Sequence, residues 1–271
     1  MEDFCNKMQM MNATGYQGIF EAAGHKLNDI GGVMLWKINA AFPSVVWQVY
    51  DWFLQTNAGY YFMQNACEPL HIQLNLNDLK VTVLNRKYKP APNLTARVEV
   101  FDFESKSVFS EEAYFSLGPS EVKVTESLAR IRENNRGILF VVLNLKDQGG
   151  RIVSHNVYWL SSDGTYKELN NLSETSVAVS IQNATNDKTG NKYSVRIVNN
   201  SSGIAFFLRP RLTVDGEEIL PSYWSAGYIT LAPSESTTLT VSCPADKISG
   251  KLPVLKLSGW NVPEQTARIV K

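Results

Sequence analysis

The spacing of hydrophobic residues changes near Pro69, and this change divides the chain into a helical part and a long part made of strands. In the first 25 residues, apolar side chains recur every three or four positions, which predicts an amphipathic helix. Gly15 and Gly18 are expected to soften or break this helix, because glycine is a poor helix former, and Gly24 is expected to end it. The apolar positions are Phe4, Met8, Met11, Ile19 and Ala22 or Ala23.

Two shorter patterns follow before Pro69. Residues Val33 to Trp36 form a continuous apolar run, which is typical of a strand that is covered on both faces. A second helix is predicted at about residues 57–67, and it stops at Pro69 because the residue before a proline avoids the α region. A helix, a buried strand and a second helix together indicate a fragment of an α/β fold.

From Pro69 onward the apolar positions alternate with polar ones, as at Leu70, Ile72 and Leu74. This pattern predicts short antiparallel strands joined by turns, for example at Asn77-Asp78 and Asp215-Gly216. About seven short strands in the first stretch indicate an immunoglobulin-like sandwich, and a second set of strands indicates another. The expected fold class is therefore mostly β: a helix–strand–helix region at 1–68, then immunoglobulin-like β-sandwiches at 69–165 and 166–271.

Composition narrows the classes of partner. The chain has 26 basic and 26 acidic residues and no basic run, so neither nucleic acid nor an anionic membrane surface is an expected partner. No apolar run is long enough for a transmembrane helix, and the first residues lack the features of a signal peptide. The three cysteines and three histidines have no spacing typical of a disulfide framework or a metal site, so we expect no metal and no cofactor.

A series of motifs, taken in order, resembles one branch of glycoside hydrolase family 2. That branch contains exo-β-D-glucosaminidases and mannosylglycoprotein endo-β-mannosidases. Each motif is weak by itself, but the ordered set covers nearly the whole chain. The motifs are Trp36, Asn39, Pro43-Ser44, Asp51, Gly59-Tyr60, Ala66–Gln73, Ile152–Leu160, Gly203–Arg209, Ile219–Pro221, Tyr228–Ser236 and Gly259–Asn261.

The resemblance implies that residues 1–68 are the C-terminal remnant of a (β/α)8 catalytic barrel, with Val33–Trp36 in its eighth strand. Family members are retaining enzymes that use two glutamates, about 5–5.5 Å apart. The resemblance places both glutamates upstream of Met1, so we expect no catalytic residue in this chain and no hydrolysis by the chain alone. It also implies a periplasmic or secreted location if the parent enzyme carries a signal peptide.

Three residues are candidate substrate contacts. At the C-terminal end of a barrel strand, the Trp36 ring would stack on a sugar, and its alternative is to fill the barrel core. The Asn39 amide can donate to and accept from a sugar hydroxyl, or bond its own loop. Asp51 could bind a hydroxyl or cap the following turn. Phe42 stands where glucosaminidase relatives often have Trp, which puts the identity of the sugar in doubt.

Two functions remain open. In the first, the chain is the C-terminal portion of a retaining β-glycosidase that acts on a β-glucosaminide or β-mannoside. Its partners would be a β-linked carbohydrate and the upstream barrel domains of the parent enzyme. In the second, the chain is a non-catalytic carbohydrate-binding or scaffolding β-sandwich module. If residues 1–68 are a barrel remnant, we expect them to be marginal in isolation, because the other strands of the barrel are missing.

Overall fold

The computed structural model describes residues 2–44, 48–187, 190–248 and 251–269. The chain divides into two compact units. The first sandwich unit consists of Met8–Leu35 and Phe62–Leu172, and the second sandwich unit consists of Met1–Lys7, Trp36–Tyr61 and Ser173–Lys271. The domain boundaries expected after residues 68 and 165 stay predictions.

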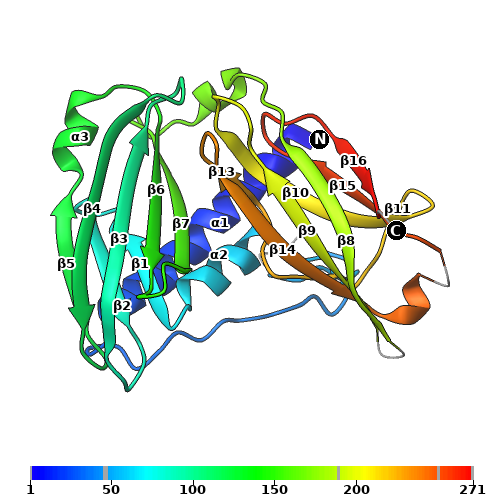
Figure 1. Cartoon of the computed structure of the whole chain (residues 1–271), viewed down its shortest axis with the longest axis horizontal. Coiled ribbons are helices and arrows are strands. Elements are labelled where there is room, and N and C mark those ends of the chain that lie inside the picture. The colour runs from blue at the N-terminus through cyan, green and yellow to red at the C-terminus, as the bar shows by residue number, and fades with distance from the viewer. Residues whose placement is uncertain (1, 45–47, 188–189, 249–250, 270–271) are drawn as a thin grey trace. The chain divides into compact units, whose positions relative to one another are not determined.

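The first sandwich unit contains two antiparallel sheets, with strand orders β1-β2-β5 and β4-β3-β6-β7 (Figure 1). Their facing surfaces enclose an apolar core in which Ile72, Val83, Val141 and Leu143 are fully buried. The elements are β1 (Leu70–Leu74), β2 (Lys80–Asn85), β3 (Ala91–Phe101), β4 (Ser107–Leu117), β5 (Val122–Ser127), α3 (Ala129–Asn134), β6 (Leu139–Lys146), β7 (Ile152–Leu160) and the 3-10 helix η1 (Lys167–Asn171).

The second sandwich unit also contains two antiparallel sheets. One has the order β11-β10-β15-β16 with β13 paired to β10, and the other has the order β12-β14-β9-β8 (Figure 1). Asp215 and Gly216 both have positive φ, as the tight turn between β10 and β11 requires, so the predicted hairpin is confirmed. The elements are β8 (Ala178–Asp187), β9 (Gly190–Val198), β10 (Ala205–Val214), β11 (Glu217–Glu218), β12 (Tyr223–Trp224), β13 (Ile229–Leu231), β14 (Ser236–Cys243), η2 (Ala245–Lys247), β15 (Val254–Ser258) and β16 (Gln265–Arg268).

The two predicted helices are present. Helix α2 spans Ala58–Ala66, close to the predicted 57–67. Helix α1 spans Glu2–His25 without a break, so the expected interruption at Gly15 and Gly18 is wrong. Each glycine costs roughly 0.5–1 kcal/mol in a helix interior, and burial of Met10, Ala13 and Tyr16 on one face of α1 offsets that cost. The apolar positions predicted from the sequence, Phe4, Met8, Met11 and Ile19, are exposed instead. No helix in the described part of the chain is long and apolar enough to cross a bilayer.

The strand expected at Val33–Trp36 is not formed. The segment that follows α1 has no regular secondary structure, and its only pairings in the described residues are isolated bridges from Tyr50 to Asn39 and Thr56. Its apolar side chains are uncovered, with Met34 98% exposed and Trp36 83% exposed. A strand buried on both faces needs neighbouring strands and covering helices, and the described residues supply neither at this position. The mostly β class with immunoglobulin-like sandwiches is otherwise confirmed.

Candidate functional site

The three predicted substrate contacts lie in the segment Trp36–Tyr61 of the second sandwich unit. Trp36 is 83% exposed, and its peptide bond to Lys37 is cis. Asn39 is exposed, and its Nδ2 donates a long hydrogen bond of 3.4 Å to the neighbouring Ala40 carbonyl. Neither side chain is enclosed by the chain itself, so both can contact another molecule.

Asp51 forms a turn. Its Oδ1 accepts hydrogen bonds from the backbone N–H groups of Phe53 at 2.8 Å and Gln55 at 2.9 Å. This is the capping arrangement that sequence reasoning gave as the alternative to a sugar contact. The Tyr50 N–H donates to the Ile38 carbonyl at 2.9 Å, which brings the backbone at Asp51 next to that at Asn39. The backbones of Asn39 and Asp51 are therefore adjacent, and Trp36 extends from the same segment.

A chain of tyrosine rings connects this segment to the second sandwich. The Tyr60 and Tyr61 centroids lie 5.1 Å apart, and Tyr61 lies 6.3 Å from Tyr228. The Tyr61 hydroxyl is hydrogen-bonded to Thr56 Oγ1 at 2.8 Å, and burial raises the pKa of Tyr61 to about 12. A Cβ at Gly227 would lie 2.7 Å from the Tyr61 ring, so only glycine allows this close approach.

Sequence reasoning missed this contact. Gly227 carried no pattern signal, and Tyr61 read only as part of a helix. Gln55 Nε2 adds a hydrogen bond of 2.8 Å to Glu218 Oε2, which also accepts one from Arg209 at 3.2 Å. The segment that carries Trp36, Asn39 and Asp51 is thus anchored on the second sandwich by specific contacts.

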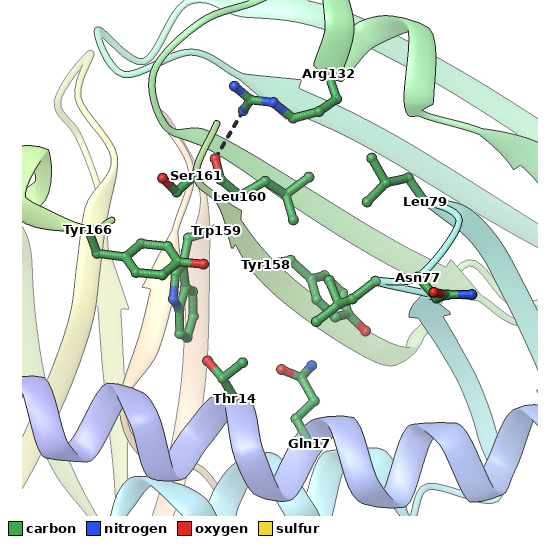
Figure 2. A pocket seen from close by; sticks show the side chains of 11 residues that line it. Thr14, Gln17, Asn77, Leu79, Arg132, Tyr158, Trp159, Leu160, Ser161 and Tyr166 are labelled. Carbon is green, nitrogen blue, oxygen red and sulfur yellow. Dashed lines mark hydrogen bonds between the residues drawn. The ribbon is translucent and has the colours of Figure 1, made fainter. Parts of the chain in front are cut away.

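A concave site lies in the first sandwich unit. It is a cavity of about 370 Å³ between α1, the end of β7 and the segment that follows β7 (Figure 2). Thr14 and Gln17 point into it from α1, and the rings of Tyr158, Trp159 and Tyr166 form its aromatic wall. Its size falls within the range of small-molecule pockets.

A buried polar network holds the floor of this cavity. The Glu21 carboxylate, on α1, accepts hydrogen bonds from Tyr158 at 2.7 Å and from Gln17 Nε2 at 3.0 Å. Its Oε1 also lies 3.2 Å from Nε2 of His71, a fully buried residue of β1. The floor is therefore fixed by charge-assisted hydrogen bonds. The predicted alternation of β1 is correct, but its polar side faces α1 instead of water.

His71 has a carboxylate at each ring nitrogen. Nε2 faces Glu21, and Nδ1 lies 3.1 Å from Glu68 Oε2. Burial alone would lower the pKa of His71, but the hydrogen bonds and charges of Glu21 and Glu68 outweigh burial, so the pKa is raised. Burial together with the Glu21 charge raises the pKa of Tyr158 well above its usual value. The two carboxylates therefore favour the protonated form of His71.

The free edge of β1 is closed by side chains of β7. The Ile72 N–H donates to Ser154 Oγ at 3.2 Å, and Asn156 Nδ2 donates to the Ile72 carbonyl at 2.6 Å. Glu21 and His71 are almost completely buried, so this cluster stabilises the unit and is not an exposed acid–base pair. In the described residues no group of three or more His, Cys, Asp or Glu side chains could hold a metal ion.

Two family models match the chain. One describes an exo-β-D-glucosaminidase Ig-fold domain and matches residues 156–262. The other describes a mannosidase Ig/CBM-like domain and matches residues 77–162.

Curated relatives match almost the whole chain. An exo-β-D-glucosaminidase of Amycolatopsis orientalis is 27% identical over 98% of this chain and 28% of its own length. An exo-β-D-glucosaminidase of Streptomyces avermitilis is 28% identical, and a mannosylglycoprotein endo-β-mannosidase of Lilium longiflorum is 26% identical. These two matches cover 98% of this chain and 32% and 34% of the relatives. The chain thus spans about a third of the length of these relatives.

Solved structures agree with the sequence matches. The crystal structure of the exo-chitosanase CsxA of Amycolatopsis orientalis superposes with a TM-score of 0.91 at 25% identity, over 98% of this chain and 35% of that chain. A β-D-mannosidase of Dictyoglomus thermophilum shares the fold, with a TM-score of 0.70 at 16% identity over 97% of this chain and 30% of that one.

Proposed function

This chain has the immunoglobulin-like domains of exo-β-D-glucosaminidases and mannosidases and corresponds to a C-terminal portion of a glycoside hydrolase family 2 enzyme, and from that premise we propose that it completes the substrate pocket of a retaining β-glycosidase. The two sandwiches brace the catalytic barrel of the parent enzyme. The substrate is a β-glucosaminide or a β-mannoside.

The exposed apolar side chains of the segment 36–54 carry this proposal. Trp36, Phe42 and Phe53 are 83%, 66% and 64% exposed, and they follow one another within a segment that is anchored on the second sandwich at its other end. A concentration of large exposed apolar side chains marks a surface that another protein part covers. In these relatives the part outside the match is about two to two and a half times as long as the matched part, and it supplies domains for that purpose.

Within the completed pocket, Trp36 stacks on the apolar face of the sugar ring, since aromatic rings combine a large apolar surface with a fixed orientation. The Asn39 amide donates to and accepts from one sugar hydroxyl. Asp51 keeps one oxygen on the turn and offers the other to a hydroxyl. The two catalytic glutamates belong to the barrel part of the parent enzyme, so the chain alone does not hydrolyse glycosides.

A hybrid enzyme tests the proposal. The portion of the Amycolatopsis orientalis exo-β-D-glucosaminidase that aligns with this chain is replaced by residues 1–271, and hydrolysis of nitrophenyl β-D-glucosaminide is measured. We expect the hybrid to be active and Trp36→Ala to lower its kcat/KM by roughly tenfold or more, because an aromatic contact to the sugar is lost. Tyr88→Ala, at a residue 92% exposed in the first sandwich unit, is the matched control and keeps full activity.

Two results contradict the proposal. One is measurable hydrolysis of nitrophenyl β-glycosides by the isolated chain, which would mean that it contains its own catalytic carboxylates. The other is a folded, active hybrid in which Trp36→Ala and Tyr88→Ala have equal kcat/KM, which would remove Trp36 from the pocket.

A further inference from the structure

We propose that the cavity of the first sandwich unit is a carbohydrate site that binds a neutral pyranose saccharide. The lining residues all belong to one compact unit of the chain. This inference goes beyond the function proposed above, because it requires no catalysis.

The wall of the cavity matches the mixed character of a sugar. Tyr166 is 40% exposed at the opening, and Trp159, 7% exposed, lies beside it deeper in the wall (Figure 2). Aromatic rings of this kind present a flat apolar surface with a polar edge. A pyranose has an apolar face formed by its C–H groups, so a ring placed against Tyr166 would bury that face.

The polar groups of the lining are amides and hydroxyls. Gln17, Asn77, Thr14 and Ser161 are spread around the cavity (Figure 2). Amide and hydroxyl groups both donate and accept hydrogen bonds, as do the hydroxyl groups of a sugar. The Gln17 side chain is preorganised, because its Nε2 is held by Glu21 at 3.0 Å. A preorganised polar group binds a ligand without losing further conformational freedom.

The charges of the lining exclude other ligand classes. Arg132 is the only charged residue of the lining, and its Nη2 already donates to the carbonyls of Asn135 and Gly137, both at 2.9 Å. Its Nη1 donates to the Leu160 carbonyl at 3.0 Å, as drawn in Figure 2. A guanidinium used in this way cannot form the two parallel bonds by which arginine clamps a carboxylate or phosphate.

A cationic amino sugar is excluded for a different reason. Arg132 is the charged residue of the lining, and its guanidinium repels a second positive charge. The Glu21 carboxylate behind the floor already accepts hydrogen bonds from Tyr158 and Gln17 and faces His71, so it is not open to an ammonium group. The site therefore differs from a pocket that recognises a glucosaminium group, and we assign it to an uncharged sugar.

Binding to the full 271-residue chain tests the assignment. Cellotriose, a neutral oligosaccharide, and the glucosamine trimer are titrated separately by calorimetry at a pH where the amino groups are charged. We expect saturable binding of cellotriose and binding of the amino trimer that is at least tenfold weaker. Equal affinity for the two trimers, or no saturable binding of cellotriose, overturns the proposal.

Two variants locate the site. Thr14→Trp fills the cavity from an exposed position of α1 and is expected to abolish cellotriose binding, whereas Ile19→Trp, at a 57% exposed position of the same helix, leaves it unchanged. Tyr166→Ala is expected to weaken binding roughly threefold to tenfold through the lost ring contact. If folded Thr14→Trp protein binds cellotriose as well as the Ile19→Trp protein does, the saccharide binds elsewhere and the assignment is wrong. These outcomes are independent of the hybrid enzyme's activity, so the two proposals fail separately.

Discussion

At the scale of single residues, the most consequential arrangement is the buried imidazole of His71 between Glu21 and Glu68. Two carboxylates from different parts of the chain converge on one ring, and Arg86 reaches the same place by donating to the Glu68 carbonyl at 2.6 Å. This cluster ties α1 to β1 most strongly when His71 is protonated, because the two carboxylates then face a positive charge. Its contribution to stability therefore depends on pH.

We predict that the free energy of unfolding of the wild-type chain falls, relative to that of His71→Gln, as the pH rises. The pKa of His71 is raised in the folded state above about 6.5, the usual value of an unfolded histidine. The stabilising contribution is therefore complete below pH 6.5 and is lost as the pH rises through the folded-state pKa. Urea unfolding at several pH values checks this, and parallel pH profiles for the two proteins would contradict it.

We predict that Glu21→Ala destabilises the chain by about 3–5 kcal/mol, because it leaves a buried charge without one of its partners. Lys7→Ala on the same helix is the control, since Lys7 pairs with Asp3 at 2.7 Å in an exposed position and its removal costs much less. Denaturant unfolding of the two variants measures the difference. Equal losses would mean that the network around Glu21 contributes no more than a surface pair.

At the scale of elements, sequence patterns correctly predicted the features that depend on residues close together in the chain. The alternation in β1 and the Asp215-Gly216 turn are set by residues close in sequence, and both were predicted correctly. The burial of the polar face of β1 under α1 was not predicted, because it depends on Glu21, some 50 residues away. The sequence held one signal for this burial, which is that Glu21 lies on the helix face that also carries buried apolar residues.

Two glycines are expected to respond in opposite ways to substitution by alanine. We predict that Gly15→Ala raises stability by roughly 0.5–1 kcal/mol, since the added Cβ meets nothing within 4 Å in α1. Gly227→Ala is expected to cost about 1–3 kcal/mol, because its Cβ would lie 2.7 Å from the Tyr61 ring. Thermal unfolding of both variants checks the two signs, and a neutral Gly227→Ala would show that the contact with Tyr61 is loose.

At the scale of the whole molecule, the candidate site could be predicted only in part. The sequence placed Trp36, Asn39 and Asp51 in one segment, and the bridge between Asn39 and Tyr50 puts the backbone of Asp51 next to that of Asn39. Their roles as sugar contacts stay predictions. The strand expected at Val33–Trp36 does not form. Its apolar pattern is that of a buried strand, but the elements that would bury it are not among the described residues.

The same reasoning yields a prediction about dynamics. In the monomeric chain, the amides of Val33–Trp36 are expected to exchange hydrogen far faster than those of Val81–Val83, which lie in β2 between two paired strands. In the hybrid enzyme, the amides of Val33–Trp36 are expected to become protected as barrel strands pair with them, while those of Val81–Val83 stay unchanged. Hydrogen exchange followed by mass spectrometry compares both forms. Strong protection of Val33–Trp36 in the isolated monomer would show that the segment has its own strand partners, and its assignment to an enzymatic barrel would then lose its physical basis.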